Sequence, residues 1–280
     1  MSKHLTVGVL ALQGAFHEHI KLLTQASASF AIDGDVRWRF VEVRTPVELD
    51  ACNALIIPGG ESTTVSLVAA RTGLLEPLRD FVKAKRRPTW GTCAGLILLA
   101  ESANKTKKGG QELIGGLDVR VNRNYFGRQT ESFEAPLDLA FLQKARTDVE
   151  SSETTRPFNG IFIRAPAVER LLPSVPGEQK GEAAVEGTVI APSKGPTTPV
   201  NQVEIMATIP GRSNALRAKL EALRLEDEAG DIVAVRQGNV FGTSFHPELT
   251  KDARIHFWWL KSVMEAVDAG QDSLDISSAI

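Results

Sequence analysis

Cysteine is scarce in this sequence. The 280 residues include only Cys52 and Cys93, too few for the disulfide framework of a small secreted protein. An excess of charge of one sign is also missing, since 32 Lys and Arg residues stand against 34 Asp and Glu residues and the net charge is −2. The chain therefore has no basic surplus for binding nucleic acid or an anionic membrane surface, and its two thiols favour a reducing compartment.

Long apolar runs are absent as well. No segment approaches the roughly 18 apolar residues of a membrane-spanning helix, and the first residues, MSKHLTVGVLALQG, lack the layout of a secretory signal. The sequence is 42% hydrophobic and 24% charged, which is typical of a globular protein with a real core. We find no internal repeat and no linker that would divide it. We therefore expect a single soluble domain over residues 1–280, located in the cytoplasm.

Short β-rich runs alternate with segments of helical spacing in the first half of the chain. The runs predict strands over 6–12, 36–43, 54–58 and 88–92, and the segments between and after them predict helices over 15–25, 63–70, 74–85 and 94–101. Such alternation, with nearly continuous apolar strands, is typical of a parallel sheet covered by helices on both faces. We therefore predict an α/β sandwich of three layers.

The pattern changes after Gly116. Three strand-like runs, LDVRVNRN, TESFEAPL and FNGIFIRAP, follow one another without helices between them, which favours antiparallel pairing. The chain returns to strands over 232–236 and 240–245 and ends in an apolar helix over 256–267.

Two segments interrupt this pattern. Residues 173–200 are rich in Pro, Gly, Ser and Thr, and their composition predicts a mobile surface insertion that tolerates shortening. Residues 211–230 are strongly charged and are expected to form a short helix on the outside. Both lie outside the motifs that carry chemistry.

The stretch GTCAGLILLA places Cys93 where a strand ends and a helix begins. Small neighbours, Gly91, Ala94 and Gly95, permit the tight strand-turn-helix geometry of a nucleophile elbow. The amides and dipole of the helix N-terminus would lower the pKa of the thiol, and the Ala94 amide would face an oxyanion formed by attack on a carbonyl. The alternative from this stretch alone is a buried structural cysteine, since free cysteines are often buried.

A second stretch, FGTSFHPELT, places His246 and Glu248 two residues apart at another predicted strand end. In an extended segment this spacing puts both side chains on one face. A histidine that is oriented by a carboxylate is the base that a cysteine nucleophile needs. Taken alone, this stretch favours the alternative in which His246 caps the strand and Glu248 is solvated, but together with Cys93 the pair favours catalysis.

A third stretch, LIIPGGESTT, again runs from a strand into glycines and a helix start. Gly59 and Gly60 let the backbone approach a ligand, and the Gly60 amide could complete an oxyanion hole. Glu61, Ser62 and Thr63 are also ordinary residues for a helix N-terminus, so this stretch has a structural interpretation too. Three such strand ends in one sheet are stronger evidence for a site than any one of them.

Taken together, these residues resemble the class I (triad) glutamine amidotransferases. The motifs LALQG, GGESTT, RNYFGRQTESFE and FIRAP resemble more specifically the glutaminase subunits of pyridoxal 5′-phosphate synthases, in order along most of the chain. The resemblance implies a flavodoxin-like sandwich with a mostly parallel sheet. The insertions at 173–200 and 211–230 depart from the compact bacterial pattern of this family.

The resemblance also implies roles for individual residues. It implies Cys93 as nucleophile, His246 as general base and acid, and Glu248 as the group that orients His246. It implies a glutamine site formed by Gly60, Glu61, Ser62, Arg123, Ile163 and Arg164. It also implies an oxyanion hole formed by Gly60, Ala94 and Gln13. Arginine suits the α-carboxylate of glutamine because its planar fork binds carboxylates in bidentate fashion.

The activity implied is hydrolysis of L-glutamine to L-glutamate and ammonia, with transfer of the ammonia to a synthase subunit that builds pyridoxal 5′-phosphate. No metal and no organic cofactor is implied. Two alternatives share parts of the pattern: the glutaminase subunit of another synthase, of the imidazole glycerol phosphate type, and a regulatory protein on the same fold with an idle thiol. The first does not account for FGRQTESFE and FIRAP, and the second predicts a broken triad, whereas all three positions are intact.

Overall fold

In a computed structural model of the chain, the structure describes residues 3–30, 36–104, 111–123, 132–144, 156–193, 201–209 and 232–277. The strands are β1 (Lys3–Leu10), β2 (Val36–Val43), β3 (Ala54–Ile57), β4 (Thr89–Thr92), β5 (Ala100–Asn104), β6 (Leu117–Asn122), β7 (Ser132–Leu137), β8 (Phe158–Ile163), β9 (Ala167–Leu171), β10 (Thr188–Ile190), β11 (Glu204–Thr208), β12 (Ile232–Gln237) and β13 (Val240–Thr243). The α-helices are α1 (Phe16–Ser27), α2 (Pro46–Asp50), α3 (Ser62–Arg71), α4 (Leu75–Arg79), α5 (Ala94–Leu99), α6 (Ala140–Lys144), α7 (Lys180–Ala183) and α9 (Arg254–Ser277).

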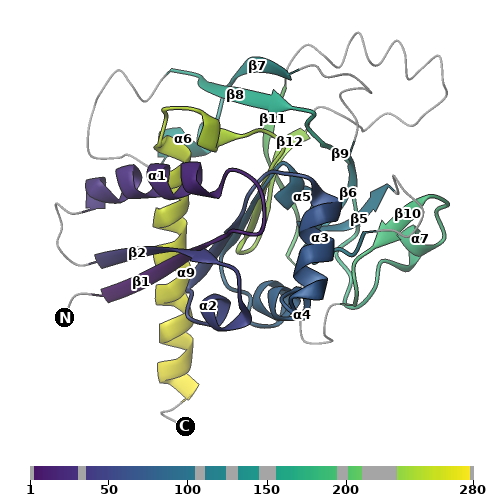
Figure 1. Cartoon of the computed structure of the whole chain (residues 1–280), viewed down its shortest axis with the longest axis horizontal. Coiled ribbons are helices and arrows are strands. Elements are labelled where there is room, and N and C mark those ends of the chain that lie inside the picture. The colour runs from purple at the N-terminus through teal and green to yellow at the C-terminus, as the bar shows by residue number, and fades with distance from the viewer. Residues whose placement is uncertain are drawn as a thin grey trace.

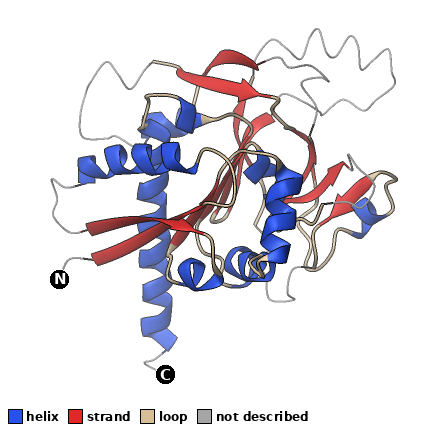
Figure 2. Ribbon diagram, in the orientation of Figure 1, coloured by secondary structure: helices blue, strands red, loops and turns tan. Residues whose placement is uncertain are grey.

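The central sheet is mixed, and its parallel part comes mainly from the first half of the chain. Its strands run in the order β10-β5-β6-β9-β12-β13-β4-β3-β1-β2, and β11 pairs with β12. Neighbouring strands from β2 across to β13 are parallel, as are β5 and β6. The later strands β9, β11 and β12 pair antiparallel with their neighbours, and β7 and β8 form a separate antiparallel pair. This arrangement confirms the predicted α/β fold and its change to antiparallel pairing (Figure 2).

Alternating side chains of the central strands build two cores, one on each face of the sheet. In β3, Leu55 and Ile57 join one buried cluster and Ala54 and Ile56 join the other, as the two-residue period of a strand requires. The first cluster includes side chains of α2, α3, α4 and α5, and the second includes side chains of α1 and α9. Figure 1 shows these two groups of helices on either side of the sheet. Within the described ranges, no helix is both long and apolar enough to cross a membrane.

The segment after Cys93 differs from the prediction of a helix over 94–101. Helix α5 ends at Leu99, and the chain is already extended at Ala100, where β5 begins. All residues over 94–103 are buried, so the run has no periodicity that distinguishes a helix from a strand. Pairing with β6 and β10, which the local sequence does not reveal, favours the strand.

Three other helices also differ from the sequence-based expectation. The predicted helix over 74–85 is divided into α4 and a π-helical turn, η2 (Asp80–Ala84). The last helix, α9, extends past residue 267 to Ser277. Helix α2 was not predicted; it begins after Thr45, whose side chain forms a capping box with Glu48.

The first part of the expected mobile insertion is folded against the sheet. Residues 180–183 form α7, and β10 pairs antiparallel with the edge strand β5. Arg120 of β6 donates two hydrogen bonds of 2.6 Å, from Nε and Nη2, to the carboxylate of the buried Glu182. Residues 173–193 therefore contain regular structure that their composition does not reveal, and charged and polar anchors replace the apolar surface that they lack. The mobility of this segment and its tolerance of shortening stay predictions. Residues 194–200, and the charged segment over 211–230, lie outside the described residues.

Candidate active site

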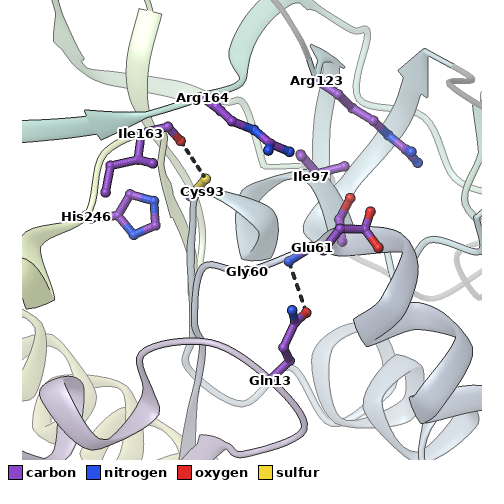
Figure 3. A pocket seen from close by; sticks show the side chains of 10 residues that line it. Gln13, Gly60, Glu61, Cys93, Ile97, Arg123, Ile163, Arg164 and His246 are labelled. Carbon is purple, nitrogen blue, oxygen red and sulfur yellow. Dashed lines mark hydrogen bonds between the residues drawn. The ribbon is translucent and has the colours of Figure 1, made fainter. Parts of the chain in front are cut away.

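The carboxyl ends of β1, β3, β4 and β13 surround a cavity of about 560 Å³. These strands are parallel neighbours in the sheet, so the segments that follow them meet at one edge. The cavity is lined by Gln13, Gly60, Glu61, Ser62, Cys93, Ile97, Arg123, Ile163, Arg164 and His246 (Figure 3). The structure thus brings together most of the site residues that the sequence predicts. The other two, Ala94 and Glu248, are buried directly behind this lining.

Cys93 forms the turn between β4 and α5 in a backbone conformation that few non-glycine residues adopt. Its φ is 48° and its ψ is −100°, and such strain persists only where the surroundings fix it. The Cys93 amide donates a 2.8 Å hydrogen bond to the carbonyl of Thr243 on β13, which holds the turn against the neighbouring strand. A Cβ atom at Gly95 would lie 2.0 Å from the carbonyl oxygen of Ile57, so only glycine permits this approach of α5 to β3. The result is the predicted elbow, with Cys93 6% exposed.

His246 follows β13 and its ring is held by Glu248. The His246 Nδ1 atom lies 2.7 Å from Oε1 of Glu248, and both side chains are buried. The sequence predicts that the two side chains share one face of an extended strand, and this is wrong. Glu248 instead lies in a 3-10 turn, η4 (Pro247–Leu249). The backbone amide of His246 donates to the Ile161 carbonyl of β8, which fixes the segment from the other side. The predicted pairing is therefore achieved by a turn.

Glycine is required at residue 59 for the imidazole to reach its position. A Cβ atom at Gly59 would lie 2.3 Å from Cε1 of His246 and 3.4 Å from Cβ of Cys93. The PGG turn after β3 thus serves a second purpose besides backbone access to a ligand. It leaves room for the ring beside the thiol.

The electrostatics of His246 follow from its two neighbours. Burial lowers the pKa of His246, but hydrogen bonding to Cys93 and to Glu248 outweighs burial and raises the pKa to about 10. The ring is therefore protonated at neutral pH. A protonated imidazole beside the sulfur stabilises negative charge on it, which a thiol needs in order to act as a nucleophile.

The PGGES turn connects the cavity to helix α3. The Glu61 carboxylate caps this helix, accepting hydrogen bonds from the amides of Thr63 and Thr64 at 3.1 and 2.7 Å. Burial would raise the pKa of Glu61, but the hydrogen bonds from Thr64 and Thr63 lower it overall, so the carboxylate is ionised. The Glu61 amide donates a 3.0 Å hydrogen bond to Oε1 of Gln13, which joins the end of β1 to the turn.

The Ser62 side chain, a predicted substrate contact, also has a partner within the protein. Its hydroxyl donates a 2.9 Å hydrogen bond to Oε1 of Gln111, a residue that the sequence did not single out. Ser62 still lines the cavity, but Gln111 fixes the direction of its hydroxyl. No local signal identified Gln111, because it lies on a different segment, 49 residues away.

Two arginines stand on the opposite side of the cavity from Gln13 (Figure 3). Arg123 is buried, and its backbone amide donates to Oδ1 of Asn104 at 2.8 Å. Burial lowers the pKa of Arg123, while the charge of Glu61 opposes that change. Arg164 is exposed at the mouth, with a left-handed φ of 45° that turns it away from the β8 strand. Ile163, which precedes Arg164 in the chain, places its carbonyl oxygen 3.9 Å from the Cys93 sulfur (Figure 3).

A thiol at a strand-to-helix elbow, next to an imidazole that a carboxylate holds, is the arrangement of enzymes that use a cysteine nucleophile. Over residues 9–208 and 203–265 the sequence matches the SNO glutamine amidotransferase family. The chain belongs to this family.

Named relatives agree with that assignment. A probable pyridoxal 5′-phosphate synthase subunit PDX2 of Arabidopsis thaliana is 40% identical over 96% of this chain and 89% of its own length. The pyridoxal 5′-phosphate synthase subunit PdxT of Pyrococcus furiosus is 38% identical over 92% of this chain and 98% of its own. A crystal structure of a glutamine amidotransferase superimposes with a TM-score of 0.59 at 33% identity, covering 92% of this chain and 98% of that one. The chain thus shares the fold of the solved structure and matches these relatives along most of their length.

Proposed function

We propose that this protein is the glutaminase subunit of a pyridoxal 5′-phosphate synthase. It hydrolyses L-glutamine to L-glutamate and ammonia, and it passes the ammonia to a separate synthase subunit. The observation that carries the proposal is the convergence of Cys93, His246 and Glu248 at one end of the sheet, beside a cavity that contains two arginines. The printed names of relatives that match along nearly their whole length support the choice of synthase.

The chemistry begins with attack of the Cys93 sulfur on the carboxamide carbon of glutamine. The tetrahedral intermediate collapses, the C–N bond breaks, and His246 donates a proton to the departing nitrogen, which leaves as ammonia. A glutamyl thioester remains on Cys93. His246, now neutral, takes a proton from water, whose oxygen attacks the thioester carbon and releases glutamate and the thiolate. Glu248 keeps the His246 ring oriented and stabilises its positive charge.

The oxyanion of the intermediate needs hydrogen-bond donors that are already in place. We assign this role to the amides of Gly60 and Ala94, with Gln13 shaping the hole from the end of β1. Gly60 has a φ of 154°, a conformation that favours glycine. A Cβ atom at residue 60 would lie 3.2 Å from Oε1 of Gln13, so a side chain there would crowd Gln13. The Ala94 amide is at the first turn of α5, where helix amides point outward unpaired by the helix itself.

The α-carbon end of glutamine carries one negative and one positive charge, and the cavity offers a partner for each. Arg123 and Arg164 are the donors for the α-carboxylate, and the ionised Glu61 faces the α-ammonium group. Gly60, Ser62 and Ile163 complete the walls around the side chain. Both cysteines are free and buried, which suits the cytoplasm, where we place this activity.

A coupled assay tests the proposal. Glutamate release from L-glutamine is measured for the full chain in the presence of the synthase subunit of a pyridoxal 5′-phosphate synthase, and pyridoxal 5′-phosphate formation is followed in the same mixture. Both products are expected with the wild-type chain. A Cys93→Ala variant is expected to fold normally, since the change removes one sulfur atom, and to release no glutamate. Normal glutamate release by folded Cys93→Ala would contradict the assignment of the nucleophile.

A further inference from the structure

A chain of buried polar side chains continues behind Glu248, away from the cavity. One carboxylate oxygen, Oε1, holds His246. The other, Oε2, is buried and, among the described residues, has no hydrogen-bond partner of ordinary geometry. A carboxylate oxygen that is shielded from water and lacks a donor costs free energy. The nearest group that could supply a donor is the side chain of His19, whose Nε2 atom is 3.4 Å from Oε2.

His19 lies on helix α1 and is fully buried. Its side chain belongs to the stripe of α1 that faces the sheet, together with Leu22, Leu23 and Ala26. At this position a packing residue would be apolar, because burying an imidazole is unfavourable unless its nitrogens are satisfied. Both nitrogens of His19 do have polar neighbours. Besides Glu248, Nε2 is 3.3 Å from the Thr92 hydroxyl, and Nδ1 is 3.0 Å from Nε2 of His256 on α9.

The protonation states of the two histidines fix the direction of these contacts. Burial lowers the pKa of His19 well below its usual value, and the neighbouring His256 and His246 lower it further. Burial lowers the pKa of His256 to about 3, with Asp252 opposing this shift. Each ring is therefore neutral and carries a single N–H.

A neutral His19 must place its proton on one nitrogen. A proton on Nδ1 would leave the lone pair of Nε2 facing a carboxylate oxygen, which is repulsive. A proton on Nε2 points toward Glu248 and Thr92, and Nδ1 then accepts from the Nε2–H of His256. The hydrogen bonds then run from His256 to His19 and from His19 to Oε2 of Glu248, while Oε1 of the same carboxylate accepts from His246.

We propose that His19 is a positioning residue for the catalytic triad: its Nε2–H supports the second oxygen of Glu248, and His256 holds His19 in the tautomer that can do so. The proposal rests on the proposed function, because it assigns His19 to the same nucleophilic centre. His19 reaches the substrate only through Glu248 and His246. Its effect is therefore on the rate of the chemical steps and not on glutamine binding.

Two polar substitutions at residue 19 separate positioning from packing. The amide nitrogen of glutamine can take the place of imidazole Nε2, whereas that of asparagine takes the place of Nδ1. His19→Gln therefore keeps a donor for Glu248, and His19→Asn removes it. In glutamine hydrolysis by the full chain with its synthase subunit, we expect kcat of His19→Asn and His19→Leu to fall roughly 10- to 100-fold, the cost of one hydrogen bond to a charged group. KM should stay within about twofold, and His19→Gln should recover most of kcat.

A merely structural role predicts a different result. Looser packing would affect the Gln and Asn variants alike and would raise KM as the cavity deforms. Equal kcat values for these two variants, or unchanged kcat in folded His19→Leu, would overturn the proposal. Thermal unfolding identifies any variant that does not fold. If His19→Leu does not fold, the comparison of kcat between His19→Gln and His19→Asn still tests the proposal.

Two further measurements complete the test. If His19 acts through Glu248, then adding His19→Asn to a Glu248→Gln variant should change kcat by less than about twofold, and a full additional loss would contradict the proposal. On the other side of the chain, His256→Leu should lower kcat and His256→Gln, which keeps the donor, should not. Equal effects of these two changes would remove His256 from the proposal.

The rate at which iodoacetamide alkylates Cys93 provides a readout that does not require glutamine. His19→Asn should slow this reaction relative to His19→Gln, since His246 is less well held beside the sulfur. If the wild-type chain releases no glutamate but this difference is found, the proposed function fails and the role of His19 stands. If the wild-type chain releases glutamate and the difference is absent, the role of His19 fails alone.

Discussion

At the scale of single residues, the proposed site separates the groups to which we assign the reaction from those to which we assign substrate binding. Cys93 and His246 lie in the buried centre, whereas Arg164 stands exposed at the mouth and Arg123 lines the wall. Charge-assisted hydrogen bonds from arginine to a carboxylate are strong. The reaction takes place at the side-chain carboxamide of glutamine, so bonds to the α-carboxylate are equally strong in the ground state and in the transition state. Loss of such a bond should therefore weaken binding and leave the chemical step intact.

We expect Arg164→Ala and Arg123→Met to raise KM for glutamine by roughly 10- to 150-fold each, with kcat changed little. Methionine at residue 123 preserves most of the buried volume, so the change tests the charge and not a cavity. Arg156→Ala, at an exposed arginine outside this cavity, is the matched control and should leave KM unchanged. Steady-state kinetics of glutamate release check the prediction. Unchanged KM in both variants would place the α-carboxylate elsewhere.

The sequence was sufficient to predict that Cys93 and His246 lie together, but not which buried side chains lie behind them. Cys93 and His246 each follow a strand and are marked by short local signals, glycines for the elbow and a histidine two residues before a glutamate. His19 and His256 contact each other across 237 residues of sequence, and each is a single polar residue in an otherwise apolar helical stripe. The signal that could have found His19 is that polar interruption on α1. It has meaning only once its partners, His256 on α9 and Glu248 after β13, are known.

At the scale of elements, the buried histidines make the contact between α1 and α9 sensitive to acid. In the folded protein the pKa of His256 is lowered to about 3 by burial, whereas in the unfolded chain it returns to about 6.5. Between these two pH values the unfolded state binds a proton that the folded state does not. The stability conferred by a neutral His256 is therefore present above pH 6.5 and is lost as the pH falls toward 3.

We expect the free energy of unfolding of the wild-type chain to decrease on acidification by about 1.4 kcal/mol per pH unit for His256 once the pH is well below 6.5. His256→Gln should remove that part of the slope. His17→Gln, at an exposed histidine of α1, should leave the slope as in the wild type. Urea unfolding at a series of pH values from 7 to 4.5 measures these slopes. Identical slopes for all three proteins would show that His256 is not the group that titrates.

The element that departs most from its sequence-based prediction is the segment over 173–193. Its low apolar content predicts a mobile surface insertion. In the structure, β10 extends the edge of the sheet, and Arg120 donates two hydrogen bonds to the Glu182 carboxylate in bidentate geometry. The side chain of Gln179 adds a hydrogen bond to the buried carboxylate of Asp118. Anchors of this kind are contacts with distant residues, so composition alone misses them.

This anchoring can be measured by removing one partner. Glu182→Ala should lower the free energy of unfolding by about 1–3 kcal/mol, since it leaves a mostly buried guanidinium without its carboxylate. Glu186→Ala, at an exposed glutamate of the same segment, should change stability by less than about 0.5 kcal/mol. Urea unfolding of both variants checks this. A result in which the two substitutions cost the same would show that the segment is not held by the ion pair.

At the scale of the whole molecule, the site is built at a seam between the end of β1 and the turn after β3. Gln13 accepts a hydrogen bond from the Glu61 amide, and a Cβ atom at Gly14 would lie 1.7 Å from the carbonyl oxygen of Gly59. With a φ of 93°, Gly14 is in a conformation that glycine adopts without strain, so the peptide between Gln13 and Gly14 can rotate at low cost. A partner that binds at this seam would act directly on the oxyanion hole.

Hydrolysis without a partner would release ammonia into water, where it is protonated and loses its nucleophilicity. We expect the oxyanion hole to be completed only when the synthase subunit binds near Gln13. One missing donor is worth ~10²–10³ in kcat, so the isolated chain should be slower than the complex by about that factor.

Gln13→Ala should lower the activity of the complex much more than that of the isolated chain, because only the complex has the complete hole. Gln25→Ala, on the exposed face of α1, is the control and should affect neither. Glutamate release is compared with and without synthase for the three proteins. Full turnover by the isolated wild-type chain, unchanged by added synthase, would show that the hole is complete without a partner.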